Sequence, residues 1–183
     1  MIEHYNVDSL RVFYTPPKIG DWNNLRHLIE KSFSGMTENT VSHLIRNRMN
    51  KMIVARTEKQ LLGFCYFEEF SHDKLHLLKL ATDKSYFRRG IASQLLKHLE
   101  SYAVDKGYKS IVLTVDKNNL AGKSFYEKMD YVLTRERKSE NKESWEKILN
   151  DECAESVIKF SFWEGDYYPL RAFKKILYKH MIR

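Results

Sequence analysis

The chain has 183 residues, 43% of them hydrophobic and 13% aromatic, and a formal net charge of +7. This composition supports one sizeable core, and the lack of any run of about 18 apolar residues or of a basic-then-apolar leader predicts a cytoplasmic protein without a membrane partner. The two cysteines, Cys65 and Cys153, argue against a disulfide framework and a thiolate site, so no metal is expected. The positive charge favours anionic partners as a class, phosphate-bearing cofactors included.

The N-terminal part of the chain predicts one strand and two helices. A strand over residues 9–15 ends at two consecutive prolines, which cannot donate to a ladder. Asp21 is placed to cap a helix that runs to about Phe33, and Thr37 opens the next helix. The apolar face of this second helix comprises Val41, Leu44, Ile45 and Met49.

In the middle of the chain the hydrophobic period changes to two. Runs rich in β-branched and aromatic residues over 52–56, 61–70 and 74–82 are separated by short polar turns, which predicts an antiparallel meander. A helix over about 90–106 follows, and Gly107 stands at the C′ position expected after it.

The second half predicts a buried strand over 109–115, a short helix over 119–129 and a strand over 131–135. A short helix over 144–150 lies in a densely charged stretch, and 156–163 has the pattern of a last strand. These last segments together predict a hairpin with a helical insertion.

The C-terminal segment alternates apolar and basic residues at helical spacing from Pro169 onward. We therefore divide the chain into one domain over 1–165 and a basic helical extension over 166–183. Packing of the extension on the domain is the favoured interpretation. Pairing with a second copy to give a homodimer is the alternative.

A glycine-containing turn joins the third run of the meander to the helix after it, and reads Phe87-Arg88-Arg89-Gly90-Ile91-Ala92-Ser93. The first turn of a helix has amide N–H groups without intrahelical partners and a partial positive charge, so it can hold a pyrophosphate. Gly90 lets the backbone approach the phosphates, and the small Ala92 and Ser93 keep the same face open. Arg88 and Arg89 add countercharge.

A second segment, residues 118–131, follows about thirty residues later and reads NNLAGKSFYEKMDY. Together the two segments resemble the GNAT superfamily of acetyl-CoA-dependent N-acetyltransferases. The pattern of that family is a strand, R/Q-x-x-G-x-G/A, a helix, a strand and then N-x-x-A-x-x-x-Y-x-K-x-G-F. The resemblance is strongest over residues 74–131.

The resemblance implies an α/β (α+β) fold with a central mixed, mostly antiparallel, twisted sheet of about seven strands flanked by helices. It also implies a splayed cofactor cleft between the fourth and fifth strands. Acetyl-CoA would be the co-substrate, with no metal. By position in the motifs, three segments would contact the cofactor. The pyrophosphate would bind the backbone amides of Arg88, Arg89, Gly90, Ile91, Ala92 and Ser93. The pantetheine arm would pair with Leu80, Ala81 and Thr82, and Asn119 and Tyr126 would also contact the cofactor.

Tyr126 takes the place of the family's tyrosine beside the sulfur, where a phenol can protonate coenzyme A as it leaves as a thiolate. The resemblance also implies an oxyanion donor, a backbone amide of the fourth strand where that strand splays from the fifth.

The sequence departs from the family pattern at several positions. Gly122 replaces an alanine and Asp130 replaces a glycine, and both are tolerable, because glycine is small and aspartate adopts left-handed conformations more readily than most residues. Phe87 replaces the first motif residue, which removes one polar contact to the phosphates. Thr114 and His76 stand where family members often carry a glutamate base. Histidine can do the same work, because its ordinary pKa of about 6.5 suits deprotonation of an ammonium. We therefore take His76 as the first candidate base, with Glu68 and Glu69 as the competing ones.

The leading function is acetyl transfer from acetyl-CoA to a primary amine by direct attack in a ternary complex. The acceptor could be a small molecule or the amine of a protein or peptide, and acids near Glu38, Glu68 and Glu69 could attract a cationic one. An alternative is a catalytically inactive acyl-CoA-binding domain with a sensing or interaction role. Nucleic acid binding ranks last, because only the tail interleaves basic and aromatic residues.

Overall fold

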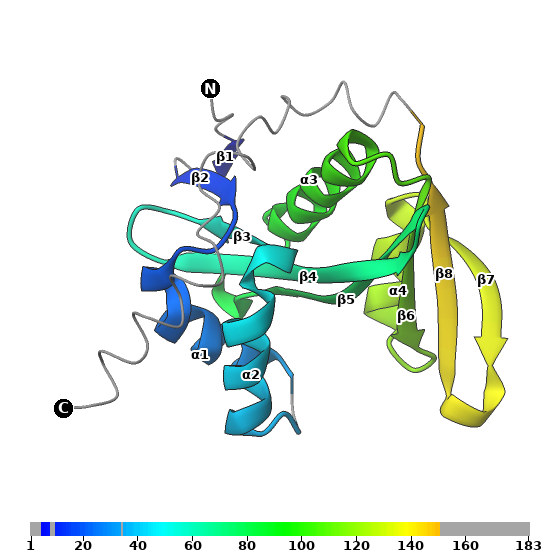
Figure 1. Ribbon diagram of the computed structural model, residues 1–183, viewed down its shortest axis with the longest axis horizontal. Helices are drawn as coiled ribbons and strands as arrows, with labels where there is room; N and C mark the ends of the chain where they lie inside the picture. The colour runs from blue at the N-terminus through cyan, green and yellow to red at the C-terminus, as the bar shows by residue number, and fades with distance from the viewer. Residues whose placement is uncertain (1–4, 8–9, 34, 151–183) are drawn as a thin grey trace.

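The computed structural model describes residues 5–7, 10–33 and 35–150 (Figure 1). Eight strands form one sheet in the order β1-β2-β3-β4-β5-β6-β8-β7. The strands are β1 (Tyr5–Val7), β2 (Leu10–Thr15), β3 (Met52–Arg56), β4 (Leu61–Ser71), β5 (Lys74–Thr82), β6 (Ser110–Asp116), β7 (Val132–Arg137) and β8 (Lys142–Ile148). The α-helices are α1 (Trp22–Ser32), α2 (Glu38–Arg48), α3 (Ile91–Asp105) and α4 (Leu120–Lys128), and the 3₁₀ turns are η1 (Ile19–Asp21), η2 (Met49–Lys51), η3 (Lys84–Tyr86) and η4 (Lys138–Glu140).

The sheet is mixed, as predicted, because every neighbouring pair is antiparallel except β5 and β6. The parallel pairing joins Lys74–Leu77 to Ser110–Leu113 and then stops, although both strands continue. The predicted splay is therefore confirmed. It lies between β5 and β6 because β1, a short strand that the sequence did not predict, pairs with β2 and shifts the numbering by one.

The two faces of the sheet carry separate apolar cores. Helix α3 covers one face and α1 and α2 cover the other (Figure 1). The α3 core includes Leu75, Leu77, Ile111, Leu113, Val115 and Trp145 of the strands with Leu95, Leu96 and Leu99 of the helix. The core under α1 and α2 includes Leu25, Ile29, Val41, Leu44 and Ile45 with Met52, Val54, Phe64 and Tyr66 of the strands.

The prediction of a helix over 144–150 is wrong, because this segment belongs to β8. The strand pairs with β6 on one side and with β7 on the other. The strand alternates with a period of two. Glu143 and Trp145 are buried on the face that α3 covers, and Ser144 and Glu146 lie on the opposite face. Pairing on both sides outweighs the local helix propensity of a charged stretch. The strand predicted over 156–163 and the extension over 166–183 lie outside the described residues.

The predicted helix ends are mostly confirmed. The Thr37 side chain accepts a hydrogen bond from the Thr40 N–H at 3.2 Å and so caps α2. At the end of α3, Gly107 has φ +81° and its N–H donates to the Val104 carbonyl at 2.9 Å, which closes the helix with a Schellman turn.

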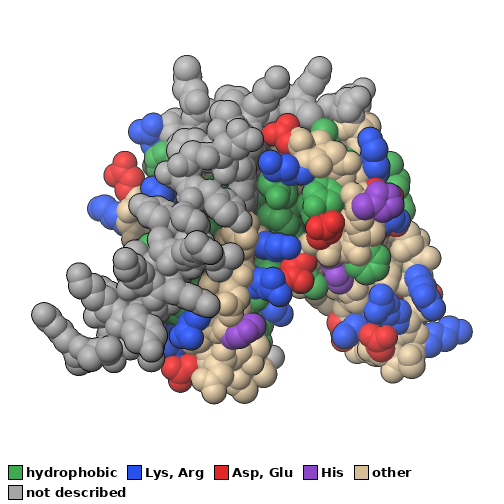
Figure 2. All heavy atoms as spheres, in the orientation of Figure 1, with side chains coloured by type: hydrophobic (Ala, Val, Ile, Leu, Met, Phe, Trp, Pro, Cys, Tyr) green, Lys and Arg blue, Asp and Glu red, His purple; other side chains and the backbone are tan. Residues whose placement is uncertain are grey.

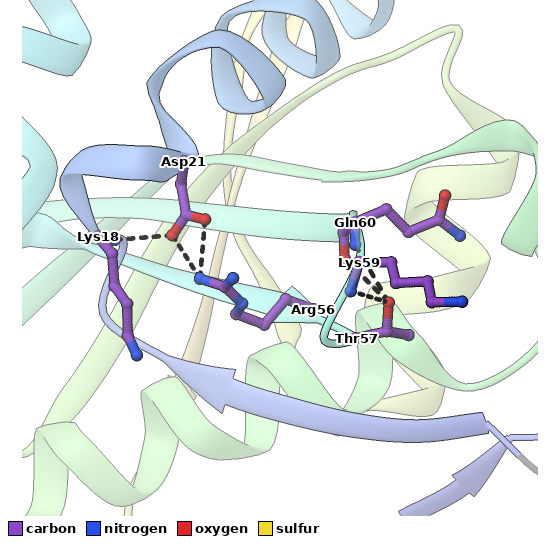
Figure 3. Close-up of polar contacts among 6 residues, drawn as sticks. All are labelled: Lys18, Asp21, Arg56, Thr57, Lys59 and Gln60. Atoms are coloured by element: carbon purple, nitrogen blue, oxygen red, sulfur yellow. Dashed lines mark hydrogen bonds and ion pairs between the residues drawn. The ribbon is translucent and has the colours of Figure 1, made fainter.

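Asp21 precedes α1, but its carboxylate does not cap that helix. It accepts the Lys18 N–H at 2.7 Å and two contacts from the Arg56 guanidinium at 2.7 and 2.8 Å (Figure 3). Close by in the same view, the Thr57 hydroxyl accepts the N–H groups of Lys59 and Gln60 in the β3–β4 turn. The Asp21 side chain thus links the start of α1 to β3 and does not cap the helix.

Candidate active site

The N-terminus of α3 forms an exposed, positively charged turn. Arg88 has φ +61° and Gly90, the N-cap residue, has φ +78°, so two left-handed residues turn the chain into the helix. Arg88, Arg89 and Gly90 are exposed, and the Arg89 guanidinium lies 5.5 Å from the centre of the Tyr86 ring. Phe87 is 56% exposed beside them. The geometry suits an anion, because the helix begins with amides that have no intrahelical acceptor.

Within the described residues, the stretch of β5 that leads to this turn is paired on one side only. From Lys79 to Thr82 the strand pairs with β4, and its pairing with β6 has already ended at Leu77. Leu80, Ala81 and Thr82 are half-buried, and the Thr82 hydroxyl is buried without a hydrogen-bond partner among the described residues. The three residues predicted to pair with a pantetheine arm therefore lie along an unpaired strand edge.

A β-bulge marks the point where β5 leaves β6. The β4–β5 register shifts between Tyr66 and Phe67, so Leu78 has no partner on β4, and β6 pairing stops one residue earlier. Leu78 is 40% exposed. The sequence analysis predicted a backbone donor here but not its residue. The Leu77-Leu78 doublet could have located this residue, because two consecutive apolar residues break the alternation of the strand and are typical of a bulge.

Tyr126 lies on α4 and packs against the α3 core. Its ring contacts Phe125 and Tyr131 at centroid distances of 5.2 and 5.8 Å. Burial raises the pKa of the Tyr126 phenol, and Cys65, the strand partner of Leu80, raises it further. Tyr126 is thus held protonated, within electrostatic range of Cys65, whose strand partner Leu80 lies on the edge of β5 that β6 leaves.

Asn119 has a structural role that the sequence analysis did not give it. It is the N-cap of α4, and its side-chain oxygen accepts the Gly122 N–H at 2.9 Å. A Cβ on Gly122 would lie 2.5 Å from the Asn119 side-chain nitrogen. Glycine at 122, the position where the family pattern has alanine, leaves room for this cap.

The two candidate bases, His76 and Glu68, lie opposite each other on β5 and β4. They lie on the face opposite α3, because Leu75 and Leu77 beside His76 belong to the α3 core. Burial lowers the pKa of His76, the Arg137 charge lowers it further and the Glu68 charge opposes both. Phe70 contacts the imidazole edge-to-face at 5.7 Å.

Glu68 is not free to act alone. Its carboxylate accepts a hydrogen bond from the Tyr66 hydroxyl and pairs with the Arg48 guanidinium at 3.1 Å. Glu69 is exposed and lies opposite Leu75, on the α3 side. Burial raises the pKa of Tyr108, and the Glu69 charge raises it further. Glu38 pairs with Arg26 of α1. The three acids that could have formed one acidic cleft are therefore dispersed, and Arg48 is a neighbour that the sequence analysis missed.

Thr114 lies on the same face as His76, one strand away. Its neighbours Leu113 and Val115 point into the α3 core, so alternation places Thr114 on the other side, half-buried and opposite Ser144 of β8. Within the described residues no group of three or more His, Cys, Asp or Glu side chains is arranged to hold a metal ion. None of the described helices is long and apolar enough to cross a membrane.

The sequence pattern of the acetyltransferase (GNAT) family matches residues 17–131. The chain belongs to this family. A search of curated proteins by sequence gave no match. The GNAT fold itself recurs in many solved structures, three of which are compared with the chain below.

Ard1 from Thermoplasma volcanium is 20% identical, with a TM-score of 0.67 over 76% of this chain and 98% of the other. The PaiA N-acetyltransferase from Thermoplasma acidophilum, solved with coenzyme A, is 20% identical, with a TM-score of 0.60 over 76% and 99%. The ribosomal-protein-S18-alanine N-acetyltransferase from Escherichia coli is 16% identical, with a TM-score of 0.63 over 76% and 94%. At these identities the likeness is one of fold.

Proposed function

We propose that this GNAT protein transfers the acetyl group of acetyl-CoA to a primary amine by direct attack in a ternary complex. The observation that carries the proposal is the unpaired edge of β5 from Leu78 to Thr82, with Tyr126 close to it and the basic turn of residues 88–93 beyond its end. Family membership supports acetyl transfer in general.

The cofactor would lie along this edge. Amides of residues 88–93 and the start of α3 would bind the pyrophosphate, with Arg88 and Arg89 as countercharges. The pantetheine amides would continue the sheet by pairing with Leu80 to Thr82, as an added strand does. The buried Thr82 hydroxyl, which has no partner among the described residues, is a ready donor for this arm.

The acetyl carbonyl would then lie at the bulge. We assign the Leu78 N–H as its oxyanion donor, because no described residue of β4 or β6 pairs with Leu78. His76 takes a proton from the acceptor ammonium, with Glu68 as the alternative base, and the free amine attacks the carbonyl carbon. As the tetrahedral intermediate collapses, the C–N bond remains, the C–S bond breaks and Tyr126 gives its proton to the departing sulfur. The excess proton on the new amide nitrogen then returns to the Tyr126 phenolate through water, so the phenol is restored.

The test measures cofactor binding and chemistry separately. Wild type, Tyr126→Phe and a matched control, Tyr108→Phe, are titrated with acetyl-CoA by calorimetry and then assayed for thiol release against a panel of amines. Tyr126→Phe is expected to keep its acetyl-CoA affinity and lose about 10²-fold in kcat, and the control to change little. Failure of the wild type to bind acetyl-CoA would refute the proposal. Binding without turnover on any amine would favour a sensing domain.

A further inference from the structure

The acceptor side of the sheet is a groove between α2 and the β7–β8 hairpin, and each of these two elements carries an arginine. Figure 2 shows a hollow between α2 and the β7–β8 hairpin, with basic and acidic side chains at its upper end. Arg48 is the last residue of α2, and Arg137 is the last residue of β7. His76 and Thr114 lie on the intervening strands, on the face that α3 does not cover.

The carboxylates on this face already have basic partners. Glu68 pairs with Arg48 at 3.1 Å, and Glu146 of β8 accepts Lys74 at 2.8 Å and the Ser110 hydroxyl at 2.6 Å. A cationic acceptor tail would have to displace these partners. The groove is therefore poorly suited to a polyamine or a lysine-rich peptide.

Arg137 is held in place but only weakly neutralised. Its Nε donates to the Ser144 hydroxyl at 3.1 Å, which fixes the plane of the guanidinium. Its ion-pair partner among the described residues is Glu140, 3.7 Å away and about half exposed, which is a weak surface pair. Because the Arg137 charge lowers the pKa of His76, the guanidinium lies within electrostatic reach of the candidate base.

We propose that the acceptor carries an anionic group, a carboxylate or a phosphate, a few bonds from its amine, and that Arg137 binds this group. The planar guanidinium fork matches either oxyanion, and Ser144 already orients it. This inference rests on the acetyl transfer proposed above and names the class of its acceptor. An anion on Arg137 would also neutralise a charge that disfavours protonation of His76, which strengthens His76 as a base once the correct acceptor is bound.

The experiment uses pairs of amines that differ only in the anionic group. Amino acids are compared with their decarboxylated amines, and phosphoethanolamine with ethanolamine, by thiol release at saturating acetyl-CoA. The wild type is expected to favour the anionic member of at least one pair by ten-fold or more in kcat/KM. The two kinds of pair separate carboxylate from phosphate as the bound group.

Two charge-removing variants on the same strand provide the comparison. Arg137→Gln is expected to lower kcat/KM for the anionic member by about 10- to 100-fold, the range for a charged hydrogen bond, and to bring the ratio within the pair close to one. Arg137→Lys should restore part of the preference. Arg135→Gln removes an equal charge from an exposed position on β7 and is expected to leave the ratio unchanged.

Equal wild-type rates within every pair, or an Arg137→Gln loss that is the same for both members, would overturn the anionic-acceptor proposal while acetyl transfer stands. Release of thiol from none of the amines, with acetyl-CoA still bound, would overturn acetyl transfer and this inference together.

Discussion

His76 is surrounded by charges of both signs on the acceptor face. Glu68 lies opposite it and favours its protonated form, and burial and Arg137 favour the neutral form more strongly, so the pKa of His76 falls below the ordinary 6.5. A base with this pKa is already deprotonated at neutral pH. As the proposed base, His76 would therefore take its proton from the acceptor rather than from water.

The pH profile of the reaction should report this residue. With His76 as the base, kcat/KM for the acceptor should rise with pH through an inflection below 6.5, since the neutral form is the active one. Glu68→Gln removes a charge that raises the His76 pKa, so the inflection should move to lower pH. His76→Gln should lose the inflection, and His72→Gln, at an exposed position in the β4–β5 turn, should keep it.

Persistence of the inflection in His76→Gln, combined with its loss in Glu68→Gln, would assign the base to Glu68 instead. The same rate measurements therefore decide between the two side chains that face each other across β4 and β5.

At the scale of elements, one glycine controls how closely α3 packs on the sheet. Gly63 of β4 lies against β5 and α3, and a Cβ there would be 2.8 Å from the Ala81 carbonyl oxygen, 3.2 Å from Leu95 Cδ1 and 3.3 Å from Ile91 Cγ2. The carbonyl oxygen belongs to the backbone and cannot rotate away. Any side chain at 63 must therefore push β5 or α3 outward.

Gly63→Ala is expected to lower the free energy of unfolding by about 1–3 kcal/mol, the usual cost of overpacking a close contact. The measurement is a urea titration with Gly20→Ala as the control, because a Cβ on Gly20 meets nothing within 4 Å. If Gly63→Ala were no less stable than Gly20→Ala, the contact with Ala81 would not limit packing here, because the entropy lost from the unfolded chain stabilises both variants alike.

The α4 helix depends on Asn119 for its start. Asn119→Ala should cost about 1 kcal/mol of stability, because the Gly122 N–H loses its acceptor, and Asn119→Ser should retain most of it. The midpoint of thermal unfolding reports the contribution of the cap to stability, and the KM for acetyl-CoA reports the contact between residue 119 and the cofactor. A KM that rises in Asn119→Ser without loss of stability would establish the cofactor contact separately from the cap.

For the whole molecule, a largely buried ion pair links the start of α1 to β3 of the sheet. Asp21 is 4% exposed, precedes α1 and pairs with Arg56 at the end of β3 (Figure 3). The Arg56 side chain is 22% exposed, so water screens part of the interaction. Removing Asp21 leaves the guanidinium and the Lys18 N–H without this acceptor.

Asp21→Ala is expected to lower the unfolding free energy by about 2–3 kcal/mol, less than for a fully buried pair because Arg56 is partly solvated. The double variant Asp21→Ala/Arg56→Met should recover part of the loss, since no charge is left unpaired. Both are measured by urea denaturation, with the exposed Arg26–Glu30 pair of α1 as the reference. A double variant no more stable than Asp21→Ala would contradict this account.

Most of the fold followed from local sequence signals. The meander, α3 with its Gly107 stop and the buried β6 have strong periodicity and clear turns, and each lies where the pattern predicted it. β8 escaped prediction because its charged sequence has no apolar run, and its strand conformation depends on partners on both sides. β1 is too short to give a periodic signal.

The candidate site also has a part that local motifs predict and a part that they do not predict. The proposed cofactor half lies within contiguous motifs, so Arg88 to Ser93 and Tyr126 could be named from the resemblance to the family pattern. The acceptor half is assembled from separate elements. Arg48 on α2 and Arg137 on β7 meet Glu68 and His76 only through the sheet order, which no local pattern encodes.

The splay of β5 from β6 gives the molecule two separate working surfaces. The turn of residues 88–93 opens the helix that covers one face, whereas Arg48 and Arg137 come from a helix and a strand that flank the other face. The family pattern ends at residue 131, before the strand that carries Arg137. On the proposed assignment, acceptor choice can therefore change by mutation in β7 while the proposed donor site keeps its inherited residues, which makes this scaffold a modular starting point for redesign.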